Sequence, residues 1–257
     1  MSIVAAVVDV TSFITLSDAS KEVFKTATLL KTLGFNALIG GEVGVGKRTL
    51  AEYILPQAVV LDGVEYEQIL LALSSSSEII ITNIDKSPNL NKVLQLAKEN
   101  DVRVVATTKT IFRDDFFSVN FSIPPLSQRL EDVDMLIDRF LSEANLLFGA
   151  KEGGFEGLDF EPDLSENSHS LRRQIMVLYL LEDIKDFELM DIIQKYLFKR
   201  LGSNGDYRKF LYLYEAPLIK AGLKKFKSQL QLSQRLGLNR NTLRKKISDN
   251  KNYLEKG

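Results

Sequence analysis

The sequence predicts an α/β fold that is followed by a smaller, all-helical domain. One observation is a short apolar segment at residues 35–40 that runs into a glycine-rich turn and then a helix-like segment. A second is a pair of short apolar-periodic segments at residues 227–247 that meet at a glycine. A third is the size of the chain, since 257 residues are enough for one large domain or two smaller ones.

The composition excludes several kinds of chemistry. The sequence has no cysteine, which rules out disulfides, thiolate metal sites and thiol catalysis. His169 is the only histidine, so we predict neither a metal site nor a histidine-based catalytic triad. The apolar start, Met1–Val10, is short and lacks a basic beginning, so it predicts a strand rather than a signal peptide. No apolar run approaches the ~20 residues of a membrane span, and we expect a cytoplasmic protein with no membrane partner.

The first expected elements lead into the glycine-rich turn. Residues 17–33 carry apolar side chains at helical spacing, and Ser17 or Asp18 is a suitable N-cap. Residues 35–40 then predict a short buried strand. The turn itself reads Gly41-Glu-Val-Gly-Val-Gly-Lys47 and is followed by a second helix, the context that supports a phosphate-binding loop.

This turn predicts a site for the phosphates of ATP or ADP. Its glycines let backbone amides turn inward, the helix N-terminus adds its positive dipole, and Lys47 adds a point charge. Arg48 stands where a Ser or Thr ligand of magnesium usually follows the lysine, and Thr49 comes one place late, so we expect Mg²⁺ to be held weakly. The expected nucleotide contacts in the turn are Gly41, Glu42, Gly44, Val45, Gly46, Lys47, Arg48 and Thr49. The alternative is a turn that only connects a strand to a helix.

The segment Lys227–Ile247 predicts two helices joined by a tight turn. The first ends at Gly237, a residue with free access to positive φ. Asn239 is placed to cap the second helix, which buries Leu243 and Ile247. Helix, glycine turn and basic helix in this order are typical of a helix-turn-helix DNA reader. The expected contacts with double-stranded DNA are Asn239, Arg240, Thr242, Arg244, Lys245 and Lys246.

The charge of the chain is uneven in a way that agrees with DNA binding. From Pro217 to the end there are eleven basic residues and two acidic ones, a net charge of +9, whereas the whole chain carries −1. Residues 1–216 therefore carry about −10. A basic end of this kind suits the phosphates of DNA. The alternative is a solvated basic helical tail.

Several stretches resemble known families. Residues 238–247 resemble the recognition helix of the Fis-type helix-turn-helix. Residues 41–51 resemble the P-loop of the bacterial enhancer-binding proteins, the NtrC-like AAA+ activators of sigma-54 RNA polymerase. Four later segments resemble the sensor I strand, the arginine-finger segment, the opening of the lid and the sensor II arginine of that family, and they are Val102–Thr108, Phe112–Phe116, Ile123–Val133 and Leu171-Arg172.

The resemblance spans nearly the whole chain and implies an architecture. It implies an AAA+ P-loop parallel sheet flanked by helices, a helical lid and an all-α Fis-type domain. Arg172 becomes a further expected contact of the nucleotide. In the arginine-finger segment Arg113 matches one of the two fingers of the family, and Val119 occupies the other position.

The sequence also departs from the enhancer-binding pattern. In the family the Walker B strand ends in Asp-Glu, which hold the magnesium shell and activate the attacking water. Here an isoleucine run is followed by Thr82-Asn83, and Asp85 comes two residues late and is expected on the surface. The insertion that carries the sigma-54 contact loop is absent, because too few residues separate the P-loop helix from this strand. The Trp-Pro-Gly-Asn run before sensor II is replaced by Asn167–Ser170.

The resemblance and the turn chemistry divide the chain into three parts. Residues 1–134 are the predicted α/β core, 135–201 the lid and 207–257 the Fis-type domain, with the polar turn Gly202–Asp206 before it. The helices at 209–226 are more apolar than one small domain needs. In the Fis-type fold such helices form a dimer interface, so a homodimer or higher oligomer is expected, with packing on the lid as the alternative.

These features predict a sequence-specific transcription regulator whose degenerate AAA+ domain binds nucleotide and hydrolyses ATP near background. Without the sigma-54 contact loop it is expected to act as a repressor or through direct contact with RNA polymerase. One alternative is an active ATPase that activates sigma-54 RNA polymerase, and a second is an architectural DNA-binding protein. We expect no receiver domain ahead of residue 12, so a signal would enter through the nucleotide or a partner.

Overall fold

The computed structural model describes residues 13–149 and 160–254 of the chain. The strand expected at Met1–Val10 lies outside these ranges. So does most of the loop that the polar composition of residues 149–167 predicts.

The chain forms two compact units, Met1–Asp183 and Ile184–Gly257. The sequence placed the last boundary in the polar turn at residues 202–206, about one helix later. The division between Asp183 and Ile184 lies within the charged run Glu182–Asp186, which interrupts the apolar pattern of the lid. The helix that begins at Asp186 is therefore part of the second unit.

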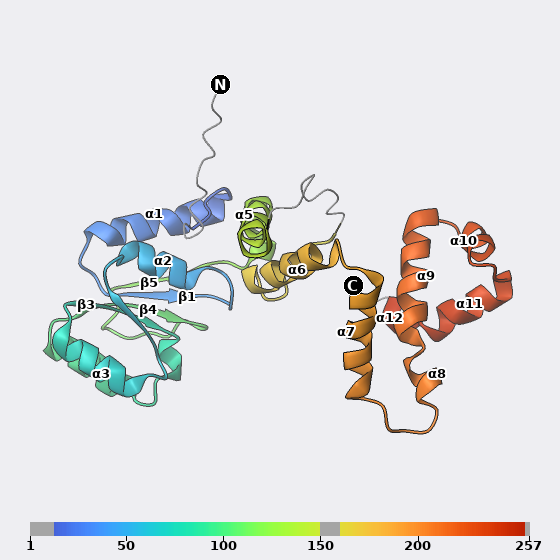
Figure 1. Ribbon diagram of the computed structural model, residues 1–257. Helices are drawn as coiled ribbons and strands as arrows, with labels where there is room; N and C mark the ends of the chain where they lie inside the picture. The colour runs from blue at the N-terminus through green and yellow to red at the C-terminus, as the bar shows by residue number, and fades with distance from the viewer. Residues whose placement is uncertain (1–12, 150–159, 255–257) are drawn as a thin grey trace. The chain divides into compact units, whose positions relative to one another are not determined.

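The first unit contains a five-stranded sheet with the order β2-β3-β4-β1-β5 (Figure 1). Its strands are β1 Ala37–Gly40, β2 Val59–Asp62, β3 Glu78–Thr82, β4 Arg103–Thr108 and β5 Val119–Ser122. All neighbouring pairs are parallel, as the resemblance implied. The carboxyl ends of the strands therefore meet at one edge of the sheet, where the glycine-rich turn follows β1.

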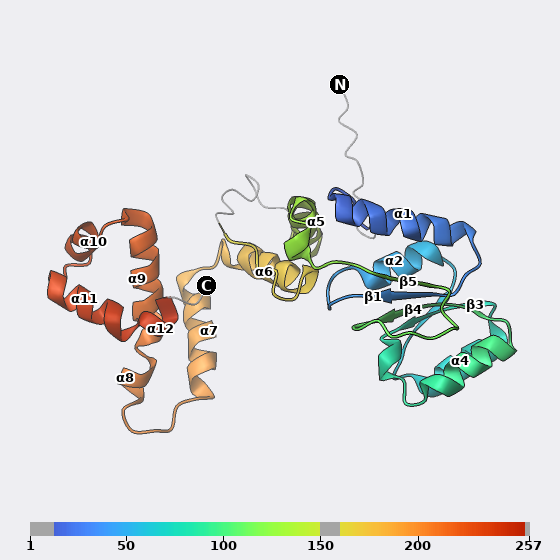
Figure 2. The same cartoon turned by 180° about the vertical axis from the view of Figure 1, so that it is seen from behind.

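Helices cover both faces of this sheet (Figures 1 and 2). Two lie on each face, α1 Asp18–Thr32 with α2 Lys47–Ile54, and α3 Tyr66–Ser75 with α4 Leu90–Glu99. Side chains of a strand alternate between the faces, so Leu38 joins the core under α3 and α4. Ala37 and Ile39 join the core under α1 and α2. Burial on both faces explains why these strands read as continuous apolar runs.

Two helices, α5 Glu131–Phe148 and α6 Ser168–Leu181, form the helical lid, which is preceded by the 3-10 turn Leu126–Gln128. The lid core consists of apolar side chains from both helices and the turn, and its buried members are Leu126, Val133, Phe140, Leu171 and Ile175. The fully buried carboxylate of Asp132 ties α5 to the start of α1. It accepts hydrogen bonds from the backbone N–H groups of Leu16 and Ser17, both at 2.9 Å.

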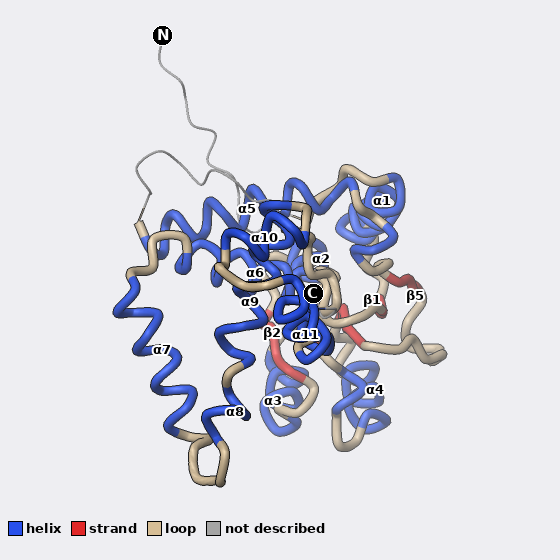
Figure 3. The backbone as a smooth tube through the Cα atoms, turned by 90° about the vertical axis from the view of Figure 1, so that its right-hand side faces the viewer, coloured by secondary structure: helices blue, strands red, loops and turns tan. Residues whose placement is uncertain are grey.

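The described part of the second unit consists of helices and turns (Figure 3). The helices are α7 Asp186–Phe198, α8 Asp206–Phe210, α9 Tyr212–Phe226, α10 Gln229–Arg235, α11 Arg240–Asp249 and α12 Lys251–Leu254. Ile219, Leu232 and Leu243 bring α9, α10 and α11 together in one small core. Gly237, at φ +64°, follows α10, so this pair of helices and its glycine turn lie where the sequence placed them.

None of the helices in the described ranges is long and apolar enough to cross a membrane.

Candidate nucleotide-binding site and nucleic-acid interface

The glycine-rich turn joins the carboxyl end of β1 to the first residue of α2. Gly41, Gly44 and Gly46 have φ values of +139°, +79° and +102°, which a residue with a Cβ rarely adopts. At Gly44 a Cβ would also lie 2.2 Å from the carbonyl oxygen of Glu166, just before the lid helix α6. Glycine is therefore required here both for the turn and for the close approach of the lid.

The lid holds three successive carbonyls of this turn. Asn167 Nδ2 donates to the oxygen of Val43 at 2.9 Å, and Ser168 Oγ donates to that of Gly44 at 2.6 Å. The guanidinium of Arg129 donates to the oxygen of Val45 at 2.6 Å. A trans peptide is planar, with its C=O and N–H pointing in opposite directions. Holding these carbonyls toward the lid therefore turns the N–H groups of the next residues away from it, as a phosphate cradle requires.

The ammonium group of Lys47 lies back over the start of the turn. Its Nζ donates to the carbonyl oxygens of Gly41 at 2.5 Å and Glu42 at 2.7 Å. Partial burial lowers the pKa of Lys47, and the negative charges of Asp85 and Glu42 oppose that change. Asp85 is exposed, as expected from the sequence, yet its charge acts on Lys47.

Arg48 and Thr49, the two residues after Lys47, have different surroundings. Arg48 is exposed and pairs with Glu52 one helical turn on, with Nε and Oε1 at 2.8 Å, so its charge is directed along the surface of α2. Thr49 lines a cavity of about 290 Å³ between the turn and the lid. Gly44, Val45 and Gly46 line the same cavity.

Arg172 also lines this cavity, from helix α6. Its guanidinium makes two hydrogen bonds to Glu143 of α5, at 2.9 Å and 2.5 Å. This partner raises the pKa of Arg172. Arg172 is thus placed at the cavity by an ion pair between the two lid helices.

The end of β3 is turned away from this cavity and toward β2. Asn83 Nδ2 donates to Asp62 Oδ2 at 2.6 Å, and Thr82 Oγ1 donates to the carbonyl oxygen of Leu61 at 3.2 Å. Asn83 has φ +51°, and its N–H donates to the hydroxyl of Thr107 at 3.1 Å. The two residues at the Walker B position are therefore engaged in a local network with a neighbouring carboxylate.

Sequence reasoning missed four residues of this site. Asp62 ends the apolar run Val59–Leu61, a signal that was available, since an acidic residue directly after a strand lies at the carboxyl edge of a parallel sheet. Arg129, Asn167 and Ser168 reach the turn only because the lid folds against it, and their spacing in the sequence gives no sign of that.

The sensor I and arginine-finger residues remain apart from the turn. Thr108 is buried, and its hydroxyl donates to the carbonyl oxygen of Thr110 at 2.9 Å. Arg113 is exposed, in the segment between β4 and β5. Val119 begins β5.

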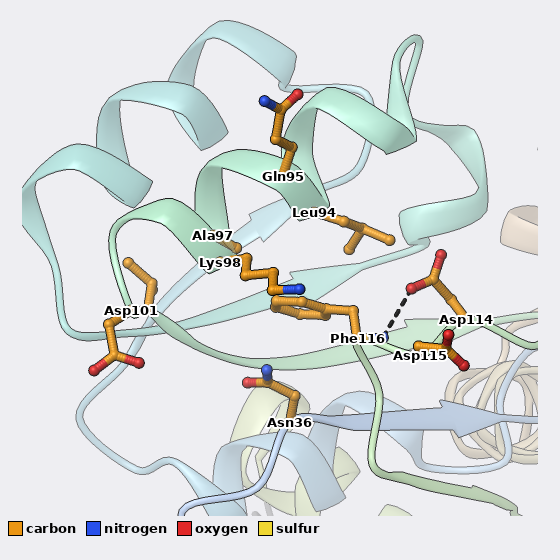
Figure 4. Close-up of a pocket in the computed structure, with 10 residues that line it drawn as sticks. Asn36, Leu94, Gln95, Ala97, Lys98, Asp101, Asp114, Asp115 and Phe116 are labelled. Atoms are coloured by element: carbon orange, nitrogen blue, oxygen red, sulfur yellow. Dashed lines mark hydrogen bonds between the residues drawn. The ribbon is translucent and has the colours of Figure 1, made fainter.

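A second cavity, of about 490 Å³, lies at the opposite edge of the sheet, beside α4 (Figure 4). Asn36 and Val102, which precede β1 and β4, place it at the amino ends of the strands. Its lining carries three acidic residues, Asp101, Asp114 and Asp115, against one basic residue, Lys98, a balance of charge that is unfavourable for phosphate. The candidate nucleotide site is therefore the cavity at the edge that holds the glycine-rich turn.

The second unit presents most of the predicted DNA contacts at one place, on α11. Arg240, Arg244 and Lys245 are exposed, and Thr242 is half-buried. The side chain of Asn239 accepts the N–H of Thr242 at 2.7 Å, so it acts as the predicted N-cap.

Lys246 differs from its neighbours. It forms an ion pair with Glu215 of α9, whose other oxygen accepts Asn250 Nδ2 at 3.3 Å. The charge of Lys246 is thus paired within the unit, although its side chain is still 32% exposed.

The first unit is an α/β domain with a five-stranded parallel sheet, a glycine-rich turn after β1 and a helical lid, and its fold is similar to that of AAA+ ATPases. No protein-family model matches the sequence. The chain is 29% identical over 200 residues to the DNA-binding transcriptional regulator NtrC of Azospirillum brasilense, covering 59% of this chain and 42% of that protein. The chain thus spans less than half the length of this curated relative.

Solved structures of NtrX from Brucella abortus have a similar fold. The complex with ADP has a TM-score of 0.56 at 18% identity, covering 93% of this chain and 70% of NtrX. The complex with ATP has a TM-score of 0.54 at 17% identity, covering 92% and 68%. At this level of identity the likeness establishes the shared fold.

Proposed function

We propose that this chain is a sequence-specific DNA-binding transcription regulator whose AAA+ domain binds ADP or ATP and hydrolyses ATP near background. One observation carries the proposal. The glycine-rich turn Gly41–Lys47, called the phosphate loop from here on, has its three glycines and its lysine and is held by the lid. The end of β3, by contrast, has Thr82 and Asn83 in place of acidic residues and is hydrogen-bonded to β2. The related NtrC is a transcriptional regulator, and the NtrX structures contain ADP or ATP. Because the target is chromosomal DNA, a cytoplasmic location is part of the proposal.

The residues present fit a nucleotide. The amides of the turn and the N-terminus of α2 would hold its phosphates, and Lys47 would leave its carbonyl partners to balance their charge. The cavity of about 290 Å³ would receive the rest of the nucleotide, between Thr49 on α2 and Arg172 on the lid. Such a ligand would contact both the sheet domain and the lid.

The same residues do not fit efficient hydrolysis. An acidic side chain at the end of β3 would hold the magnesium shell, and a second would orient water. Thr82 and Asn83 supply neither charge, and Asn83 is bonded to Asp62. The absence of a second arginine finger, with Val119 in its place, would lower the rate further. The alternative of an active sigma-54 activator is disfavoured on these grounds.

DNA binding would use the exposed face of α11. The tail from Pro217 carries a net charge of +9, and three basic side chains of α11 lie in solvent. Such a surface would supply both phosphate contacts and base contacts. Without a sigma-54 contact loop, regulation would proceed by repression or by direct contact with RNA polymerase.

A dimer would place two such helices in successive turns of the major groove, ~34 Å apart. Apolar side chains on α7, α8 and the start of α9 support this part of the proposal. Tyr207 is 81% exposed, Tyr214 68% and Met190 62%, and none of the residues of α7 is buried. Two apolar cavities, of about 490 and 350 Å³, share Ile193, Leu197 and Leu201. This surface is suited to a second copy of the chain, and light scattering at micromolar concentration should report at least a dimer.

Selection from a pool of random duplexes, followed by titration of the selected DNA at two salt concentrations, tests the proposed function. Arg244→Ala should lose about 1–3 kcal/mol on the selected DNA if it reads a base edge. Lys245→Ala should weaken binding to all duplexes alike and reduce the salt dependence, as loss of a phosphate contact does. Lys246→Ala is the matched control, since its charge is already paired, and should have the smallest effect. Unchanged binding in an Arg240/Arg244 double alanine variant would rule out α11 as the reader.

A further inference from the structure

The side chain of Asn167 does not make the hydrogen bond that is usual for an asparagine directly before a helix. An Asn directly before a helix normally caps it by accepting a backbone N–H of the first turn. The side chain of Asn167 makes no such bond to α6, and its backbone has φ +54° and ψ −128°. A residue with a Cβ keeps this strained conformation only where surrounding contacts enforce it. Those contacts are with the phosphate loop and with Leu126 at the start of the lid.

The side-chain amide of Asn167 joins three segments of the first unit. Nδ2 donates to the carbonyl oxygen of Val43 at 2.9 Å and to Glu42 Oε2 at 3.0 Å. Oδ1 accepts the backbone N–H of Leu126, where the lid begins, at 2.7 Å. These neighbours distinguish the oxygen from the nitrogen of the Asn167 side chain, because a carbonyl only accepts and a backbone N–H only donates. Asn167 is 1% exposed, so the network is shielded from water.

The network acts on the orientation of the loop peptide. The carbonyl of Val43 is held toward the lid by Asn167, so the N–H of Gly44 must point away from it. Ser168 repeats the arrangement one residue later, with its N–H at 3.2 Å and its hydroxyl at 2.6 Å from the oxygen of Gly44. If the lid moved away, both peptides would be free to rotate, and the phosphate cradle would have to be reordered when a nucleotide binds.

We infer that Asn167 is a positioning residue that couples the lid to the phosphate loop and sets nucleotide affinity without touching the nucleotide. The inference rests on the proposed nucleotide site. It identifies a route by which a partner that moves the lid would alter the affinity for nucleotide. The route is mutual, since a nucleotide that orders the loop would also strengthen the hold on the lid.

The test uses Asn167→Asp, which has nearly the same shape. It keeps the acceptor for Leu126, loses both donors and places a carboxylate against Glu42. We expect ADP binding, measured by calorimetry, to weaken by roughly tenfold or more. Asn89→Asp is the matched control, because the Asn89 side chain only accepts a backbone N–H, and it should bind ADP as the unchanged protein does. Adding Glu42→Gln to Asn167→Asp restores a donor between the two side chains and should recover part of the loss.

Hydrogen exchange of residues 41–47 without nucleotide gives a second readout. Exchange should be faster in Asn167→Asp than in the unchanged chain and in Asn89→Asp. If the unchanged chain binds no nucleotide, the proposed function fails, and faster exchange would still support the coupling. Should Asn167→Asp fail to fold, Ser168→Ala removes one hydroxyl donor to Gly44 and should shift both readouts in the same direction by less. Equal exchange and equal ADP affinity in the folded variant and its control would overturn the inference.

Discussion

The carboxyl ends of β1 and β3 lie on the same edge of one sheet and are built in opposite ways. After β1, the carbonyls of Val43, Gly44 and Val45 are held by the lid, which turns the N–H groups of the next residues away from it. After β3, Thr82 and Asn83 are bonded to the neighbouring strand β2. Under the proposed function, holding a phosphate and cutting it depend on different strands, so one can be lost while the other is kept.

The hydrogen bond between Asn83 and Asp62 gives the carboxyl end of β3 a structural role of its own. At 2.6 Å it is a charge-assisted hydrogen bond, which is stronger than one between neutral groups. Gly63 packs directly behind it, since a Cβ there would lie 2.2 Å from the carbonyl oxygen of Asn83. The end of β3 is a packed structural joint, and an acid placed there would meet a carboxylate that is already present.

Removal of Lys47 should have the largest effect on the β1 end. Lys47→Ala deletes the only side-chain charge within the loop that is suited to phosphate, and ADP binding should fall by about two orders of magnitude. Calorimetry measures the loss, and circular dichroism should show an unchanged fold, because Lys47 bonds only to backbone carbonyls. Lys92→Ala, an exposed position on α4, serves as the control and should bind ADP normally. Full binding by Lys47→Ala would remove the loop from the site.

Gly44→Ala tests how closely the lid is packed on the loop. The new Cβ would be strained at φ +79° and would lie 2.2 Å from the Glu166 oxygen, so the variant should lose about 1–3 kcal/mol of stability. The melting temperature should fall by roughly 2–4 °C per kcal/mol for a unit of this size. Gly34→Ala is the matched control, since a Cβ there meets nothing within 4 Å. Equal melting temperatures for the two variants would show that the lid is not held at Gly44.

The smallest effect is expected at the β3 end. Thr82→Asp with Asn83→Glu restores the family pattern, yet the new carboxylates would face Asp62, so phosphate release should stay near background. Adding Asp62→Asn removes the opposing charge, and turnover should then rise above that of the double variant. If the variant with Thr82→Asp and Asn83→Glu hydrolyses ATP while Asp62 is still present, then Asp62 does not suppress hydrolysis at the end of β3.

Much of the fold could be predicted because local signals agreed with one another. The strand before Gly41, the helix after Lys47 and the cap at Ser17 all lie where the apolar spacing and the capping chemistry placed them. The turn at Gly237 and the cap at Asn239 do so as well. The compact units separate after residue 183, whereas the turn at 202–206 carries the stronger local turn chemistry, so a division by compactness and a division by turn signals need not coincide.

The contacts that brace the site could not be predicted in the same way. Asn167 and Val43 are separated by 124 positions, and their bond exists only once the lid has folded back on the loop. The pairing of Lys246 with Glu215 is also a tertiary contact, so sequence reasoning grouped Lys246 with its outward-facing neighbours. Residue types could be read from the motifs, whereas the direction of each side chain depended on the packing of distant segments.

The most direct test of the account measures nucleotide binding and phosphate release on one preparation of the unchanged protein. Calorimetry with ADP and with ATP reports on the β1 end, and phosphate release in the presence of ATP and Mg²⁺ reports on the β3 end. We expect binding of at least one nucleotide together with phosphate release near background. Turnover of about 1 per second or faster, in the range of ordinary enzymes, would contradict it.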